Sequence, residues 1–120
     1  MKRIALASLV VAVVAAVAML TTAQAATPVL KGEVGPGFTI EVKKAGKKVK
    51  TLKAGKYTIK VEDKGSIHNF HLMGPGVNKK TGVSFTGETT WKLTLKPGKY
   101  TYQCDPHAAS GMKGSFKVTK

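Results

Sequence analysis

Apolar and polar side chains alternate along almost the whole chain after residue 28, and glycine or proline interrupts the alternation at short intervals. In the stretch that holds Tyr57, Ile59 and Val61, for example, every second residue is apolar. A period of two is typical of a strand with one buried face, whereas an amphipathic helix repeats every three to four residues. About seven to eight short strands in roughly 95 residues predict an all-β fold, a Greek-key antiparallel β-sandwich.

Two of the expected strands carry side chains that the later argument uses. In the first, Phe38, Ile40 and Val42 share one face. The second follows Gly65, and within residues 66–72 the alternation places His68 opposite to Asn69 and His71. The stretch 73–86 lacks a regular pattern, so we expect a long loop there with at most one turn of helix.

The first 25 residues have the features of an export signal. Lys2 and Arg3 precede an apolar stretch from Ile4 to Leu20, and the small residues of Ala23-Gln24-Ala25 follow. This order matches the charged, apolar and cleavage regions of a signal peptide. An uncleaved anchor is the alternative, although 17 residues is near the lower limit for crossing a bilayer. We therefore expect a signal peptide at 1–25 and one domain at 26–120, in a periplasm or outside the cell.

The mature domain is strongly basic and contains one cysteine. Removal of Lys2 and Arg3 lowers the formal charge from +14 to +12, and every remaining cationic side chain except histidine is a lysine. Nucleic-acid recognition favours the bidentate fork of arginine, so a lysine surface instead suits rapid encounter with an acidic protein. Exported proteins usually pair their cysteines, but Cys104 has no intramolecular partner. We expect its thiol to be buried, reactive or bound to a ligand.

A candidate metal site lies in the second half of the chain. Cys104, His107 and Met112 follow a C-x-x-H-x-x-x-x-M pattern, and His68 lies upstream. Taken singly, each has a simpler interpretation, since cysteine and methionine fill cores and histidine often serves hydrogen bonding. Together, one thiolate, two imidazoles and a weak axial thioether are the ligands of a blue-copper site. Met73 or a backbone carbonyl remains an alternative axial ligand.

These residues resemble those of cupredoxins, the small type-1 blue copper proteins, in their plastocyanin and pseudoazurin branch. The similarity covers the whole mature chain, and it is carried by Tyr100-x-Tyr102-x-Cys104-x-Pro106-His107, Met112, Gly114-x-Phe116 and His68-Asn69. The resemblance implies one copper per chain, held by His68, Cys104, His107 and Met112. It also implies that the protein shuttles single electrons between redox partners and is not an enzyme.

The same resemblance assigns two supporting residues around the copper. The backbone N–H of Asn69 would donate to the cysteine sulfur, and its side chain would tie the two ligand segments together. Pro106 would remove a second N–H donor to the sulfur, which leaves more electron density on the thiolate and favours Cu(II). Pro106 is equally a turn former. His71 should face away from the copper, because it lies three residues after His68 in the expected strand.

The expected partners are redox proteins with an acidic docking surface. We expect a monomer that binds no nucleic acid and does not stay inserted in a membrane after signal cleavage. Two other functions remain open at this point: copper storage or delivery without electron transfer, and a metal-free extracellular interaction module with the same sandwich. Enzymatic activity is disfavoured, because a type-1 site with all positions filled leaves no position for a substrate.

Overall fold

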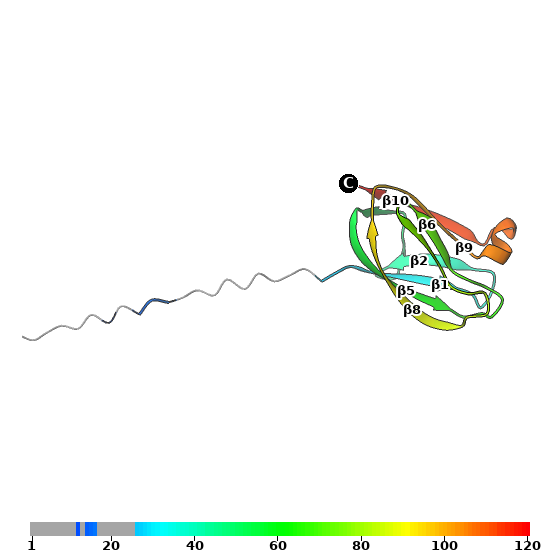
Figure 1. Ribbon diagram of the computed structural model, residues 1–120, viewed down its shortest axis with the longest axis horizontal. Helices are drawn as coiled ribbons and strands as arrows, with labels where there is room; N and C mark the ends of the chain where they lie inside the picture. Colours follow the sequence, from blue (N-terminus) through cyan, green and yellow to red (C-terminus); the bar gives the residue numbers. More distant parts are fainter. Residues whose placement is uncertain (1–11, 13, 17–25) are drawn as a thin grey trace, which may run out of the picture.

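The computed structural model describes residues 12, 14–16 and 26–120. Residues 26–120 form two five-stranded sheets packed face to face (Figure 1). Most of the expected signal peptide at 1–25 lies outside the described residues. In the part of the chain that the structure describes, no helix is long and apolar enough to span a membrane.

The first sheet is built around two central strands that run in parallel. Its order is β3-β2-β1-β5-β8, and β1 pairs in parallel with β5 from Val29 opposite Thr58 to Val34 opposite Asp63. The other neighbours are antiparallel. The strands are β1 (Val29–Val34), β2 (Ile40–Lys44), β3 (Lys47–Lys48), β5 (Gly55–Asp63) and β8 (Gly87–Leu95).

Four of the five strands of the second sheet come from the C-terminal half of the chain. Its order is β4-β10-β9-β6-β7, with β4 parallel to β10 and the other pairs antiparallel. The expected sandwich is confirmed, although short strands raise the number to ten and two pairings are parallel. The strands are β4 (Thr51–Lys53), β6 (His71–Gly74), β7 (Val77–Lys80), β9 (Gly98–Gln103) and β10 (Lys113–Thr119).

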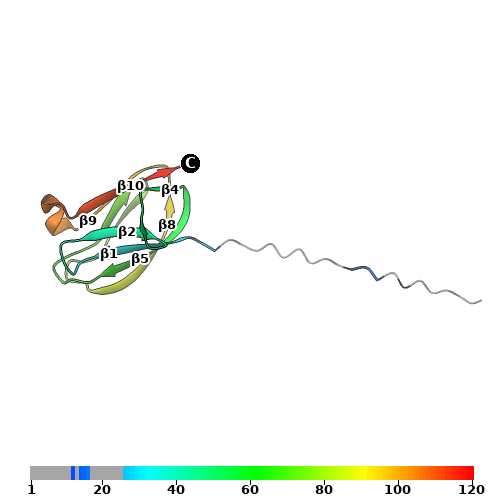
Figure 2. The same cartoon turned by 180° about the vertical axis from the view of Figure 1, so that it is seen from behind.

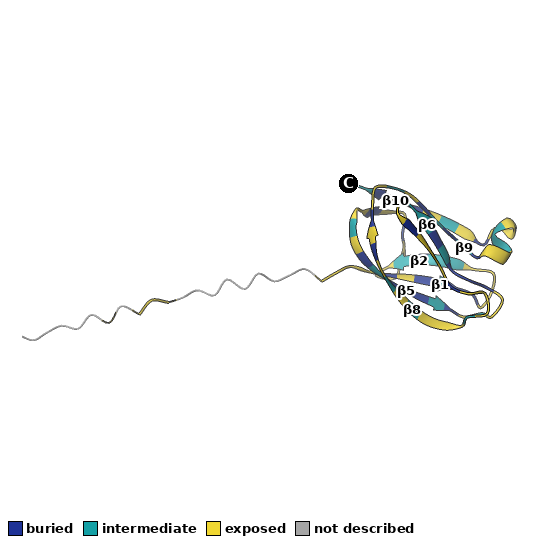
Figure 3. Cartoon of the chain, viewed as in Figure 1, coloured by how far each residue is buried: buried dark blue, intermediate teal, exposed yellow. Residues whose placement is uncertain are grey.

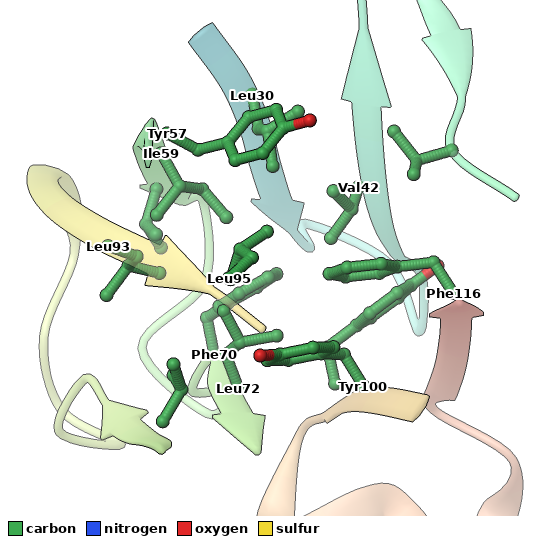
Figure 4. Packing of buried hydrophobic residues seen from close by; sticks show 14 of the residues in the cluster. Leu30, Val42, Tyr57, Ile59, Phe70, Leu72, Leu93, Leu95, Tyr100 and Phe116 are labelled. Carbon is green, nitrogen blue, oxygen red and sulfur yellow. The ribbon is translucent and has the colours of Figure 1, made fainter. Parts of the chain in front are cut away.

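The core lies between the two sheets, and buried residues alternate with more exposed ones along many of their strands (Figure 3). Aromatic rings fill its centre. Tyr100 stacks on Phe116 (Figure 4), with ring centroids 5.3 Å apart. Phe70 stacks on Tyr102 at 6.0 Å. Large buried rings remove more water-exposed apolar area than any other side chains, so they contribute most to the hydrophobic stabilisation of a domain of this size.

Two local predictions are wrong. The segment 64–70 is not a strand, and β6 begins only at His71. Its backbone makes isolated hydrogen bonds instead of a strand ladder. The His68 N–H donates to Gly65 O, the Phe70 N–H donates to Thr81 Oγ1, and Phe70 O accepts from the Thr81 N–H. The expected loop 73–86 is in part a hairpin, because β6 and β7 pair through Gly74 opposite Val77. The glycines and proline of that turn interrupt the alternation, so the sequence pattern did not indicate the two short strands.

The sandwich has two distinct ends. At one end, which we call the loop end, β1, β5 and β9 finish and a 3₁₀ helix, η1 (Asp105–Ser110), follows. At the other, which we call the entry end, the chain enters β1 and β10 finishes (Figures 1 and 2). The nine residues of β5 run from one end to the other, a length of about 30 Å at roughly 3.3 Å per residue.

Candidate metal centre

His68 is held at the loop end by two glycines. Its side chain is fully buried. A Cβ atom added at Gly65 would lie 2.9 Å from the His68 Cδ2 atom, and one added at Gly35 would lie 3.1 Å from it. Gly35 also has a positive φ of 73°, which favours glycine. The imidazole therefore fills a slot that only glycine backbone leaves open.

Cys104 directly follows β9, and η1 brings the chain back towards it. The Cys104 N–H donates to Met112 O at 3.0 Å, the His107 N–H donates to Cys104 O at 3.1 Å, and the Met112 N–H donates to His107 O at 3.2 Å. Gly111 ends the helix with a φ of 96°, the left-handed conformation that such a stop requires. These bonds close residues 104–112 into a compact loop.

The loop and His68 bring three metal-binding atoms together. His68 Nδ1 and His107 Nδ1 are 3.1 Å apart, and Cys104 Sγ lies 3.6 Å from the first and 3.4 Å from the second. Among the described residues, these three form the cluster of histidine, cysteine and acidic side chains whose ligand atoms all lie within 4.8 Å of one another. His71 is outside this cluster.

The triangle of donor atoms has a size that fits a metal ion. The centre of a triangle with these edges is about 2 Å from each corner, close to the roughly 2.0–2.3 Å of bonds from His nitrogen and Cys sulfur to a first-row metal. Two imidazoles and a thiol whose lone pairs converge on one point also match the ligand preference of copper. The residues present therefore fit the metal that the sequence implied.

The position of Met112 differs sharply from that of Met73. The Met112 side chain is 3% exposed and its backbone bonds to both Cys104 and His107. Met73 lies in β6 opposite Thr101, which precedes Cys104 by three residues, or about 10 Å along the strand. Of the two methionines, Met112 is thus the one that the backbone keeps beside the cluster.

Asn69 links the two segments that carry the cluster. Its Oδ1 accepts from the Asp105 N–H at 2.7 Å, and its Nδ2 donates to Asp105 Oδ2 at 2.9 Å. Nδ2 also reaches Thr81 O at 3.3 Å. Among the described residues, the polar neighbours of Cys104 Sγ within bonding distance are the two imidazole nitrogens, and the N–H of Asn69 is not one of them. Pro106 lies in the first turn of η1.

A network of polar side chains extends from Asp105 to the neighbouring hairpin. His71 Nδ1 lies 2.8 Å from Asp105 Oδ1, and His71 Nε2 lies 2.6 Å from Asn78 Oδ1. Burial raises the pKa of Asp105, but hydrogen bonds from Gln103, Asn69 and His71 outweigh it and bring the pKa to about 2. The carboxylate is therefore charged at neutral pH and joins β6, β7 and β9 to the start of η1.

A second acid at the loop end has the opposite shift. Asp63 is 2% exposed, and its Oδ1 accepts from the Gly65 N–H at 3.0 Å. Among residues 12, 14–16 and 26–120, its Oδ2 has no hydrogen-bond partner, and neither has the buried Nε2 of His68. Burial raises the pKa of Asp63, and the Gly65 bond and the charge of His68 only partly oppose it.

An exposed aromatic side chain lies against the partly exposed His107. Phe38 is 66% exposed, and its ring meets those of His68 and His107 edge to face, with centroids 5.4 and 4.9 Å away. Ile67, beside His68 in the chain, is 54% exposed. Phe38 was expected to share a strand face with Ile40 and Val42, but β2 begins only at Ile40, so Phe38 belongs to the loop end.

Sequence reasoning did not find Gly35, Gly65, Phe38 or Asp105. The two glycines were identified only as turn residues, because nothing local reveals that they face an imidazole. Asp105 had one available signal: an acidic residue directly after Cys104, in a chain with only six Asp and Glu, stands out. Its partners are Asn69, His71 in β6 and Gln103 in β9, so its network depends on the tertiary fold.

Two imidazoles and one thiol converge at one end of a small single-domain β-sandwich. This is the architecture of a type-1 copper protein. A sequence model of the copper-binding proteins of the plastocyanin/azurin family matches residues 38–119. The chain belongs to this family, and its cofactor is copper.

Solved structures of other copper proteins share the fold. Rusticyanin from Thiobacillus ferrooxidans is 26% identical with a TM-score of 0.56, over 80% of this chain and 79% of that chain. Another rusticyanin structure is 24% identical with a TM-score of 0.60, over 80% of both chains. Reduced auracyanin from Roseiflexus castenholzii is 21% identical with a TM-score of 0.55, over 80% of this chain and 100% of that one.

Proposed function

We propose that this protein is an exported type-1 copper protein that carries single electrons between redox partners. His68, Cys104 and His107 would hold one copper ion per chain, with Met112 as the axial ligand. The observation that carries the proposal is the convergence of two Nδ1 atoms and one Sγ atom within 4.8 Å of one another at the loop end. The family match over residues 38–119 supports copper as the metal.

The bound copper supplies a one-electron Cu(I)/Cu(II) couple. The protein's part is to keep the ligand positions fixed, so that little rearrangement accompanies the change of charge. The glycine slot holds His68, and the backbone bonds of residues 104–112 hold the other three side chains. Asn69 holds the two segments at a constant separation through its bonds to Asp105. Without an N–H, Pro106 adds no donor to the thiolate.

Partner proteins would dock at the loop end. His107 is partly exposed there, and Phe38 and Ile67 provide apolar area beside it. Exposed apolar patches typically mark interaction sites. Lys79, Lys80 and Lys113 are exposed at the same end, since Lys80 lies opposite His71 and Lys113 follows Met112. We infer that these lysines steer a redox partner with an acidic docking surface.

Export and domain organisation complete the proposal. Residues 1–25 serve as a cleavable signal peptide, and residues 26–120 form the copper-binding domain, a monomer in the periplasm or outside the cell. Filled ligand positions leave the copper without a site for a substrate, which supports electron transfer over catalysis.

The test combines a visible spectrum with voltammetry on the purified protein. Addition of Cu(II) should produce an intense blue or green colour from thiolate-to-copper charge transfer, and voltammetry should give a reversible one-electron wave. Colour with an irreversible wave would favour copper storage or delivery. A colourless protein that binds no copper would favour a metal-free interaction module.

The steering role has a separate test. The rate of electron transfer to an acidic redox protein should fall as ionic strength rises, because salt screens charges separated by more than about 10 Å at 0.1 M. Replacing Lys79, Lys80 and Lys113 with glutamate should lower the rate at low salt. Rates that are indifferent to salt and to this variant would refute the steering role.

A further inference from the structure

The acidic residues of the mature domain gather at one of its two ends, whereas exposed lysines occur at both. All six acidic residues lie at or near the loop end, since Glu33 is opposite both Glu41 and Glu62, and Glu62 is opposite Glu88. Asp63 ends β5 and Asp105 begins η1. The ion pairs among the described residues all involve these acids and their neighbours Lys31, Lys43, Lys64 and His71.

The entry end carries an uncompensated set of lysines. Five exposed lysines line a hollow of about 720 Å³ formed by residues 44–53 together with Pro28 and Tyr57: Lys44, Lys47, Lys48, Lys50 and Lys53. None of them takes part in an ion pair within the described part of the chain. Like charges this close repel one another, and the fold gains nothing from gathering them unless something anionic binds there.

Two similar turns extend this basic surface. The segments Leu52-Lys-Ala-Gly-Lys-Tyr57 and Leu95-Lys-Pro-Gly-Lys-Tyr100 each turn into a strand whose tyrosine is buried. Gly55 lies opposite Leu95, so both turns are at the entry end. Beyond Lys53, they place the exposed Lys56, Lys96 and Lys99 there, and Lys117 lies opposite Lys99. Charge thus covers the whole end of the sandwich, over strands of both sheets.

The chain enters the domain inside this basic surface. Pro28 lines the same hollow as the five lysines. Seven residues, 21–27, join Pro28 to the apolar stretch that ends at Leu20, and the eight steps from Leu20 to Pro28 reach at most about 28 Å when extended. Wherever that stretch meets a bilayer, during export or as a retained anchor, the entry end is the part of the domain nearest to the membrane.

We propose that the entry end is a binding surface for an anionic membrane, with phospholipid headgroups as its ligands. Clustered lysines next to a bilayer bind negatively charged lipids, and a surface spread over a whole end of the domain suits a broad anionic plane. The copper ligands lie at the opposite end, about 30 Å away along β5. The bound protein therefore presents its electron-transfer face to solvent, and membrane binding does not depend on copper.

The experiment is co-sedimentation with vesicles of equal parts phosphatidylglycerol and phosphatidylcholine, and with vesicles of phosphatidylcholine alone. The protein is expressed with its own N-terminal segment, and every variant is checked by mass to have the same N-terminus. At an ionic strength of about 0.01 M, binding to the anionic vesicles should be at least about tenfold tighter than to the neutral ones. At about 1 M, where the Debye length is about 3 Å, the difference should disappear.

Two variants with the same change in net charge test whether the membrane-binding surface is the entry end. K47E/K48E/K50E changes three exposed, unpaired lysines there, and K79E/K80E/K113E changes three exposed lysines at the loop end. The first should weaken binding to anionic vesicles by about tenfold or more, and the second by less than about threefold. An unchanged copper band and melting temperature show that each variant is folded.

Three results would overturn the proposal. Absence of binding to the anionic vesicles at low salt would refute the proposed membrane-binding surface. Equal losses in the two variants would mean that net charge alone is responsible. Binding to soluble polyaspartate with none to vesicles would assign the entry end to an acidic polymer. Because these readouts need no copper, they stand or fall separately from the electron-carrier function.

Discussion

The two ends of this sandwich differ in where they put their polar groups. The loop end contains all four polar or charged residues that are buried in the described chain: Asp63, His68, Asn69 and Thr81. The entry end instead exposes its charges, as lysines without acidic partners. Hydrogen bonds hold Asn69 and Thr81 at the loop end, and the glycine slot holds His68. One small fold thus combines a rigid, dry site with a solvated charged surface, because the sandwich keeps them about 30 Å apart.

The largest effect should come from the thiol. In Cys104→Ser, the colour of the copper-loaded protein should vanish, because the charge-transfer band requires the thiolate. The K47E/K48E/K50E variant at the entry end should retain the full band. An absorption spectrum after addition of Cu(II) measures both. A blue Cys104→Ser protein would mean that Cys104 is not the ligand.

The glycine slot should give the next largest effect. In Gly65→Ala the new Cβ would lie 2.9 Å from His68 Cδ2, so the ring or the loop must shift. We expect a loss of about 10–100-fold in copper affinity and a cost of about 1–3 kcal/mol in unfolding free energy. Gly37→Ala is the matched control, because no atom lies within 4 Å of its added Cβ. Competitive copper titration and denaturant unfolding check the pair, and equal effects at both glycines would contradict the slot.

Hydrogen bonds at the two ends should differ in how much they contribute to the free energy of unfolding. Asn69→Ala leaves the Asp105 N–H without its side-chain acceptor and should cost about 1–3 kcal/mol. At the entry end, Tyr57 donates to Lys53 O at 2.7 Å, and Tyr57→Phe should cost about 0.5–1.5 kcal/mol. Urea unfolding of the metal-free proteins compares them. A larger loss for Tyr57→Phe would show that the loop end is not the more tightly determined one.

The smallest effects concern stability at acid pH. The pKa values of two acids at the loop end, Asp63 and Asp105, are shifted in opposite directions. The pKa of Asp63 in the folded protein is raised above the ordinary aspartate value of 3.8. Its contribution to stability therefore falls as the pH rises from 3.8 through the folded pKa. The pKa of Asp105 is about 2, so its contribution is present above 3.8 and is lost as pH falls towards 2. Because the Asp105 side chain is partly exposed, we expect at most about 1 kcal/mol from it.

Unfolding of metal-free Asp63→Asn and Asp105→Asn between pH 7 and pH 2 measures these signs. Relative to the wild type, Asp63→Asn should be most favourable at pH 7 and lose that advantage as the pH falls. Asp105→Asn should be less stable at pH 7 and approach the wild type near pH 2. Parallel pH profiles for the two variants would refute the assigned shifts.

The sequence alone predicted the sandwich and the residues of the metal cluster. Alternation with a period of two is a local property, and so is the spacing that puts Cys104, His107 and Met112 in one short loop. The predicted strand at 66–72 was wrong over residues 66–70, because alternation is local and does not specify a partner strand. Its alternation was real, but its hydrogen bonds go to Gly65, Thr81 and Asp105 instead of to a neighbouring strand.

Only the tertiary structure decided what surrounds the cluster and where the lysines gather. The slot formed by Gly35 and Gly65, the exposed Phe38 ring and the Asp105 network all join segments that are far apart in sequence. The gathering of the acids at the loop end depends on strand register, which pairs Glu33 with Glu41 and Glu62 and also brings the two lysine turns together. Residue types thus fix the chemistry that this chain can perform, whereas long-range strand pairing fixes which of those residues meet.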